Sequence, residues 1–198
     1  MKLLVFDLGH VLIDFEWMKV CYAFSERLSK PTHEILRAFD YVGGLGYERG
    51  HITTRDFVDK FNEQLAANLS LSEFESLWST SFRENSSMAD LLKSLKVNYR
   101  LCLLSNTNVS HYEFIQNSFD VERHFDETVL SYRVGFVKPQ EEIYREVVRK
   151  CGVEFKDCLF VDDLEPNVKA ARTLGMKAIQ FTEVEGLKSE LTGFGIKI

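Results

Sequence analysis

The amino-acid sequence predicts an α/β fold, a doubly wound parallel sheet with a small helical cap inserted after the first strand. The first observation is a set of short apolar runs at residues 3–6, 101–104, 128–130, 159–161 and 178–181. Helical patterns lie between these runs, and this alternation is typical of a parallel sheet that helices cover on both faces. The second observation is the segment from residue 15 to about 83, which carries amphipathic patterns but no strand pattern.

Two helices of the predicted sheet domain have clear C-terminal signals. One covers Glu141–Cys151 and precedes Gly152, and the other covers Pro166–Leu174 and precedes Gly175. A glycine directly after the last helical turn commonly takes the left-handed conformation that caps a helix. These two helices therefore alternate with the apolar runs as a doubly wound fold requires.

The inserted segment has helix boundaries of its own. Pro31 ends the first helix, and Thr53 with Asp56 provides an N-cap and an acid in the first turn of a later one. Ser70 and Glu73 fit the capping-box pattern before another apolar periodic run. These signals predict an all-helical insert.

The insert is predicted to belong to the same folded unit as the sheet. The Gly-Gly-Leu-Gly run at residues 43–46 predicts a loop, because closely spaced glycines weaken a helix. The chain has no repeat and no linker rich in Pro or Ser, and 198 residues are enough for one domain with a modest insert. The predicted organisation is a core domain of residues 1–14 and 85–198 with a helical cap of residues 15–84.

Composition narrows the class of protein. Acidic residues number 30 and basic residues 24, mixed along the chain, so the sequence predicts no nucleic-acid surface. The first apolar run is too short for a signal peptide or a membrane span, which predicts a cytoplasmic protein without membrane contact. The four cysteines form no CxxC pair and the five histidines show no ligand spacing, so neither a disulfide nor a transition-metal site is expected.

Polar residues follow four of the apolar runs. The first run ends in Asp7, the second in the Ser-Asn-Thr-Asn run at residues 105–108, and the fourth in the acidic pair at residues 162–163. Lys138 lies in the loop after the third run. Ligands of open parallel sheets bind at the carboxyl ends of the strands, so these groups are expected to share one edge. A carboxylate, a hydroxyl, a lysine and an acidic pair together predict a phosphate site with a metal ion.

Charge explains why this combination suits phosphate chemistry. A carboxylate at Asp7 repels a phosphate by roughly 4 kcal/mol per pair of unit charges at about 4 Å and an effective dielectric constant near 20. Mg²⁺ held by Asp7 and the acidic pair would cancel that repulsion. Lys138 would neutralise further charge and Ser105 would hold phosphoryl oxygens. Asp7 could then act as a covalent nucleophile.

These residues resemble the four sequence motifs of the haloacid dehalogenase superfamily, in the same order along the whole chain. The motifs are Phe6-Asp7-Leu8-Gly9, Leu104-Ser105-Asn106-Thr107-Asn108, Lys138-Pro139 and Val161-Asp162-Asp163. The pattern is most similar to small bacterial phosphatases that act on α-D-glucose 1-phosphate, and more distantly to the phosphatase domain of soluble epoxide hydrolases. The resemblance implies a helical cap that closes over the substrate.

The resemblance also implies a role for each motif residue. Asp7 would be the nucleophile, Lys138 would bind phosphate and support catalysis, and Ser105 with Asn106 would bind phosphate or substrate. Asp162 would ligate Mg²⁺ with Asp163 beside it, and Asp7 and the carbonyl oxygen of Gly9 would be further ligands.

One position departs from most phosphatases of the superfamily. They carry a second aspartate two residues after the nucleophile as general acid and base, whereas this chain has Gly9. The closest family members resemble this chain in having glycine there. The neighbouring His10 is a possible substitute, although consecutive residues at a strand end normally point in opposite directions.

The sequence therefore predicts a Mg²⁺-dependent phosphatase that acts on a small phosphorylated metabolite through an aspartyl-phosphate. A sugar phosphate such as glucose 1-phosphate is the expected substrate. The order of the acidic residues argues against a response-regulator receiver, in which the acidic pair comes first. A 2-haloacid dehalogenase, which needs no metal, and a non-catalytic protein that binds a phosphorylated ligand remain as alternatives. The sequence identifies neither the exact substrate nor the oligomeric state.

Overall fold

Five parallel strands form the central sheet of the computed structural model, which describes residues 1–198. In spatial order the strands are β5 (Glu127–Leu130), β4 (Arg100–Ser105), β1 (Leu3–Phe6), β6 (Cys158–Asp162) and β7 (Lys177–Gln180). All four neighbouring pairs are parallel. The doubly wound α/β fold predicted from the apolar runs is confirmed.

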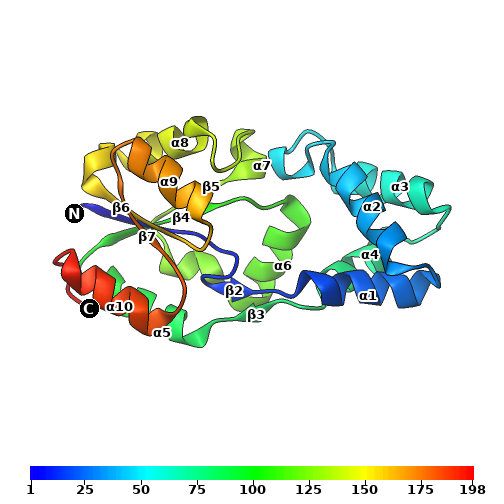
Figure 1. Ribbon diagram of the computed structural model, residues 1–198, viewed down its shortest axis with the longest axis horizontal. Coiled ribbons are helices and arrows are strands. Elements are labelled where there is room, and N and C mark those ends of the chain that lie inside the picture. Colours follow the sequence, from blue (N-terminus) through cyan, green and yellow to red (C-terminus); the bar gives the residue numbers. More distant parts are fainter.

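Helices cover both faces of this sheet (Figure 1). One face packs on α5 (Ser86–Lys96), α6 (Val109–Phe119) and α10 (Val184–Gly193), and the other on α8 (Glu141–Cys151) and α9 (Glu165–Thr173). Along β1 the side chains alternate between the two faces, with Leu4 and Phe6 in the first cluster and Leu3 and Val5 in the second. Burial on both faces explains why the strand sequences are continuously apolar.

The expected ends of the two sheet-domain helices agree closely with the structure. The helix α8 has the predicted bounds, and Gly152 caps it with φ of 64°. The helix α9 begins one residue before Pro166, and Gly175 follows it with φ of 95°. Short helical elements complete the domain; they are η2 (Val121–His124), α7 (Ser131–Val134) and η3 (Phe155–Asp157).

Residues 17–78, between β1 and β4, form four α-helices and one 3-10 helix with a hydrophobic core of their own, and this part is called the insert below. Its elements are α1 (Trp17–Leu28), α2 (Thr32–Gly43), η1 (Tyr47–Arg49), α3 (Thr54–Leu65) and α4 (Leu71–Trp78). Both predicted N-terminal signals, at Thr53 and Ser70, form complete capping boxes. The glycine loop begins one residue later than expected, because Gly43 still belongs to α2.

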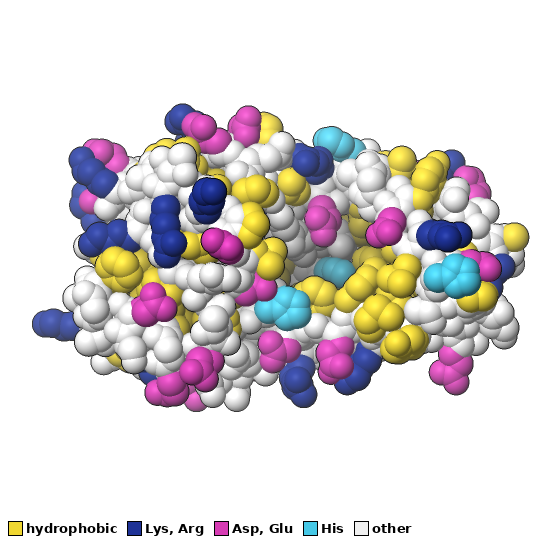
Figure 2. Space-filling model, in the orientation of Figure 1, with side chains coloured by type: hydrophobic (Ala, Val, Ile, Leu, Met, Phe, Trp, Pro, Cys, Tyr) yellow, Lys and Arg dark blue, Asp and Glu magenta, His cyan; other side chains and the backbone are white.

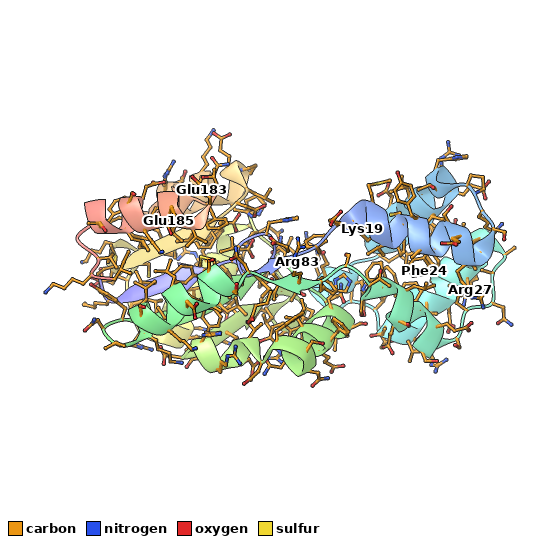
Figure 3. All side chains as sticks on the ribbon, turned by 90° about the horizontal axis from the view of Figure 1, so that it is seen from below. Lys19, Phe24, Arg27, Arg83, Glu183 and Glu185 are labelled. Carbon is orange, nitrogen blue, oxygen red and sulfur yellow. The ribbon has the colours of Figure 1, made fainter.

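Two connections join the insert to the sheet domain. The strands β2 (Ile13–Asp14) and β3 (Arg83–Glu84) form an antiparallel pair, and Figure 3 shows Arg83 in this narrow connection. The sequence pattern predicts no strand in this region, because two residues are too few to produce a periodic signal. The second connection is η1, which packs against α7 of the sheet domain. None of the helices is long and apolar enough to cross a membrane.

Candidate active site

The carboxyl ends of the three central strands bring the predicted residues together. The strand β1 lies between β4 and β6, so Asp7 is flanked by Ser105 and Asp162. The backbone N–H of Asp7 donates to the carbonyl oxygen of Val161 at 2.9 Å, which continues the sheet pairing to the end of the strand. The edge of the sheet thus fixes the nucleophile candidate between the hydroxyl and the acidic pair.

Lys138 holds two of these carboxylates. Its Nζ lies 2.6 Å from Oδ1 of Asp7 and 2.6 Å from Oδ2 of Asp162, and it donates to the carbonyl oxygen of Leu104 at 3.1 Å. The Lys138 side chain is 1 % exposed. Three acceptors use all three donors of the ammonium group, as a buried charge requires. Burial lowers the pKa of Lys138, but the carboxylates of Asp7 and Asp162 outweigh it, so the net direction is upward.

The side-chain amide of Asn106 holds the backbone of Lys138. Its Oδ1 accepts from the backbone N–H of Lys138 at 2.7 Å, and its Nδ2 donates to the backbone carbonyl of the same residue at 3.0 Å. The family resemblance implies that Asn106 binds phosphate or substrate. In this geometry its side-chain amide binds both backbone groups of Lys138, so its direct effect is to fix the lysine in place.

Asp162 is occupied by protein donors. Its Oδ1 accepts from the N–H of Leu164 at 2.9 Å and from Nδ2 of Asn167 at 2.9 Å. Its Oδ2 accepts from Lys138 and again from Asn167 at 3.1 Å. A carboxylate has about four lone-pair sites, so these four contacts leave little capacity for another ligand. The sequence prediction missed Asn167, although its position in the first turn after the acidic pair was available as a signal.

Asp7 keeps one oxygen free. Its Oδ1 accepts from the N–H of Leu8 at 2.7 Å and from Lys138, whereas its Oδ2 has no partner in the protein. Burial raises the pKa of Asp7, the charge of Lys138 opposes this rise, and the nearby charge of Asp162 adds to it. Two buried carboxylates share a single lysine, so the site holds an excess of negative charge that a cation would relieve.

The donors around this excess charge suit Mg²⁺. Carboxylate oxygens of Asp7, Asp162 and Asp163 lie within 4.8 Å of one another. Oxygen-only donors match the preference of Mg²⁺, which keeps several water ligands. Asp163 is partly exposed, and its side chain makes no hydrogen bond to another residue. Asp163 and the unbonded carbonyl of Gly9 therefore have free oxygen atoms for a metal, whereas Asp162 is saturated.

A cavity of about 520 Å³ lies between this edge of the sheet and the insert. Figure 2 shows the hollow between the sheet domain and the insert, with hydrophobic side chains gathered on its wall. Ser105, Asn106 and Gly9 line it from the sheet domain. The remaining lining residues are Leu8, Ile13, Phe15, Trp17, Phe39, Asp40, Gly43, Tyr47, Glu48, Phe57, Trp78, Phe82, Thr107, Asn108, His111 and Ile115. No lysine or arginine is among them, so this space suits the uncharged part of a phosphomonoester.

Two histidines near the site have different surroundings. His111 stacks on Trp78 with ring centroids 4.5 Å apart, and burial lowers its pKa to about 3, which keeps the ring neutral. His10 stacks on Phe15 at 4.5 Å and lines a separate polar cavity with Asp14. His10 therefore does not face the space above Ser105. The sequence assigns no role to His111, because its contact with Trp78 joins residues from the sheet domain and the insert.

The chain is similar to known proteins of one family. A family model described as a haloacid dehalogenase-like hydrolase matches residues 1–175. D-ribitol-5-phosphate phosphatase from Bacteroides thetaiotaomicron is 27 % identical over 96 % of this chain and 97 % of its own length. Flavin mononucleotide hydrolase 1 from Arabidopsis thaliana is 24 % identical over the whole chain and 79 % of its own length.

A solved structure is also similar. A HAD family enzyme from Bacteroides thetaiotaomicron, in complex with magnesium and inorganic phosphate, superposes with a TM-score of 0.84 and 30 % identity. The match covers 92 % of this chain and 94 % of that one. The similarity thus includes both the sheet domain and the insert.

Proposed function

We propose that this chain, which belongs to the haloacid dehalogenase-like hydrolases and is a phosphatase of that family, hydrolyses a small sugar phosphate through an aspartyl-phosphate on Asp7. The observation that carries this proposal is the free Oδ2 of Asp7. Its other oxygen is fixed by Leu8 and Lys138, so the carboxylate is held in one orientation with one oxygen available for attack.

Each step of the proposed reaction uses a group at this edge of the sheet. Oδ2 of Asp7 attacks phosphorus, the bond from phosphorus to the leaving oxygen breaks, and water then hydrolyses the aspartyl-phosphate. Lys138 neutralises charge on Asp7 and on the transferring group, and Ser105 offers a hydroxyl to a phosphoryl oxygen. Bound Mg²⁺, held by Asp7, Asp163 and the Gly9 carbonyl with Asp162 behind them, would supply charge neutralisation.

The substrate proposal rests on the relatives and on the cavity. The bacterial relative acts on a phosphorylated sugar alcohol, and the cavity has room for a leaving group of that size. We propose residues 15–84 as a cap that closes over this leaving group. Glucose 1-phosphate remains our specific candidate, because the ring oxygen of the sugar makes an anomeric leaving hydroxyl more acidic than an ordinary alcohol.

The proposal is tested by replacing Asp7 with asparagine. Asp7→Asn should abolish release of phosphate from a panel of sugar phosphates, because the amide is nearly isosteric but is not a nucleophile. Activity of the parent protein should disappear with excess chelator and return with Mg²⁺.

The control for this experiment is the fold of the variant, measured by circular dichroism and thermal unfolding. A folded Asp7→Asn protein that keeps more than a few per cent of activity would contradict the covalent role of Asp7. Full activity of the parent in excess chelator would contradict the metal requirement and favour dehalogenase-like chemistry.

A further inference from the structure

The geometry points to Glu48 as the general acid and base of the reaction, in place of the carboxylate that is missing at Gly9; this inference rests on the proposed function. Glu48 lies on η1 of the insert and lines the same cavity as Gly9, Ser105 and Asn106. The leaving oxygen of a substrate whose phosphate lies above Ser105 therefore faces the cavity in which this carboxyl group lies.

The sheet domain itself offers no such acid. Gly9 has no side chain to offer, and an added Cβ there would be in van der Waals contact with Cε1 of Phe15 at 3.4 Å. His10 stacks on Phe15 and lines the separate polar cavity. A proton for the leaving group has to come from another wall of the active-site cavity.

Contacts with the sheet domain place η1 beside Lys138. Nη1 of Arg49 donates to Oε1 of Gln140 at 2.5 Å. Gly50, with φ of 69°, lies so close to α7 that an added Cβ would be 2.3 Å from the carbonyl oxygen of Tyr132. These two contacts lie on either side of Lys138 in the sequence, and Glu48 directly precedes the residues that make them. The insert is therefore fixed to the sheet domain at the point where Glu48 enters the cavity.

Four titratable side chains line this cavity, and three fit the role poorly. His111 is neutral and packed against aromatic rings. The hydroxyl of Tyr47 forms a hydrogen bond with the hydroxyl of Thr54 at 2.9 Å. Burial raises the pKa of Tyr47, so its hydroxyl is a weak acid. Asp40 lies on α2, whose main contacts are with α1 and α3 within the insert.

The electrostatic surroundings of Glu48 support the geometry. Glu48 keeps access to solvent and lines the cavity. Partial desolvation by the surrounding protein raises the pKa of Glu48, while the charges of Arg49 and Lys138 oppose that rise. A raised pKa is the direction that favours a general acid.

The proposed proton transfers balance over the two steps. In the first, the Glu48 carboxyl gives its proton to the leaving oxygen while the bond from phosphorus to that oxygen breaks and the bond to Oδ2 of Asp7 forms. In the second, the Glu48 carboxylate takes a proton from the attacking water while the bond to Oδ2 breaks and inorganic phosphate leaves. Glu48 ends protonated and Asp7 ends as a free carboxylate.

The test compares two leaving groups in Glu48→Gln. The acid matters for ribitol 5-phosphate, whose alkoxide is a poor leaving group, and not for 4-nitrophenyl phosphate, whose phenolate leaves without a proton. We expect kcat/KM for ribitol 5-phosphate to fall by about 10²- to 10⁴-fold and that for 4-nitrophenyl phosphate to change by less than about threefold. Because kcat/KM reports only steps up to leaving-group departure, loss of the base should appear separately, as a lower kcat after a burst of nitrophenolate.

Glu63→Gln is the matched control, since it removes one carboxylate from the exposed surface of α3. Glu63→Gln should leave kcat/KM for both substrates unchanged. An equal fall in kcat/KM for the two substrates in Glu48→Gln would mean that Glu48 only holds the insert in place, and the proposal would be wrong. If the parent hydrolysed neither substrate, the proposed function itself would fail first, so the two failures are distinguishable.

Discussion

The sheet domain and the insert are stabilised in different ways. At the edge of the sheet, buried polar groups satisfy one another, as in the contacts of Lys138 with Asp7, Asp162 and Leu104. The interior of the insert is apolar and contains a cluster of aromatic rings around Phe24, which lies on α1 (Figure 3). There the Nε1 of Trp78 is buried without any hydrogen-bond partner.

This difference indicates that the sheet domain and the insert contribute differently to the proposed site. Buried polar networks are costly unless every group is paired, and they hold side chains in one geometry. Aromatic packing stabilises by burial of apolar surface and tolerates small shifts. In the proposed reaction the sheet domain fixes the reacting groups, while the insert supplies an apolar wall and the carboxylates of Asp40 and Glu48.

The largest loss of stability and activity is expected when Lys138, in the polar network, is replaced. Lys138→Ala leaves two buried carboxylates without their shared cation, and breaking a buried pair costs about 3–5 kcal/mol of unfolding free energy. Phosphate binding and turnover should weaken together, because the charge stabilises both ground and transition states. Urea unfolding and steady-state kinetics measure the two effects.

Lys156→Ala is the matched control for Lys138. This lysine pairs with Glu154 at 2.7 Å, and both side chains are more than 70 % exposed. A pair of this kind contributes at most about 1 kcal/mol, so the control should change neither stability nor kinetics appreciably. If Lys138→Ala behaved like its control, the polar network would not be what distinguishes the sheet domain.

A comparable loss of stability is expected in the insert, with a different effect on activity. Phe24 is fully buried, with ring centroids of Phe39, Phe61 and Phe74 at 5.0 to 5.2 Å. Phe24→Ala should cost about 3–5 kcal/mol through the cavity that it leaves. Since the site residues lie in the other part, kcat/KM for 4-nitrophenyl phosphate should change much less than that for ribitol 5-phosphate.

Tyr22→Ala, on the same helix but 57 % exposed, is the control and should change stability by no more than about 0.5 kcal/mol. Equal loss of activity on both substrates in Phe24→Ala would show that the polar site depends on the packing of the insert. The separation between the two parts would then be wrong.

A smaller, pH-dependent effect is expected where the two parts meet, at His111. Burial lowers its pKa from 6.5 to about 3, so the unfolded chain binds a proton between these values while the folded protein does not. The contribution of neutral His111 to the free energy of unfolding should therefore be fully present above pH 6.5. It should decrease as the pH falls, by up to about 3 kcal/mol at pH 4. His111→Gln should remove this part of the acid sensitivity in urea unfolding at pH 7 and pH 4.

The exposed His33 is the control, and His33→Gln should keep the acid sensitivity of the parent. An unchanged difference between pH 7 and pH 4 in His111→Gln would mean that the ring titrates freely. The stacking on Trp78 would then not isolate it from water.

The sheet, its strand ends and the family were all predictable from the sequence alone. Continuous apolar runs specify strands buried on both faces, and parallel strands bring their carboxyl ends to one edge, so Asp7, Ser105 and Asp162 were expected to share that edge. The capping boxes of the insert were equally predictable. All of these signals act within a few residues or follow from the geometry of a parallel sheet.

The contacts of each polar group, in contrast, follow only from the packed chain. Two partners of Lys138, Leu104 and Asp162, lie 34 and 24 residues away in the sequence, and the amide of Asn106 reaches the Lys138 backbone across 32 residues. Hydrogen bonds depend on distances of a few tenths of an ångström, which packing sets and local sequence patterns do not encode. For the same reason no sequence pattern indicates that Glu48, far from every motif, faces the cavity at the carboxyl ends of the strands.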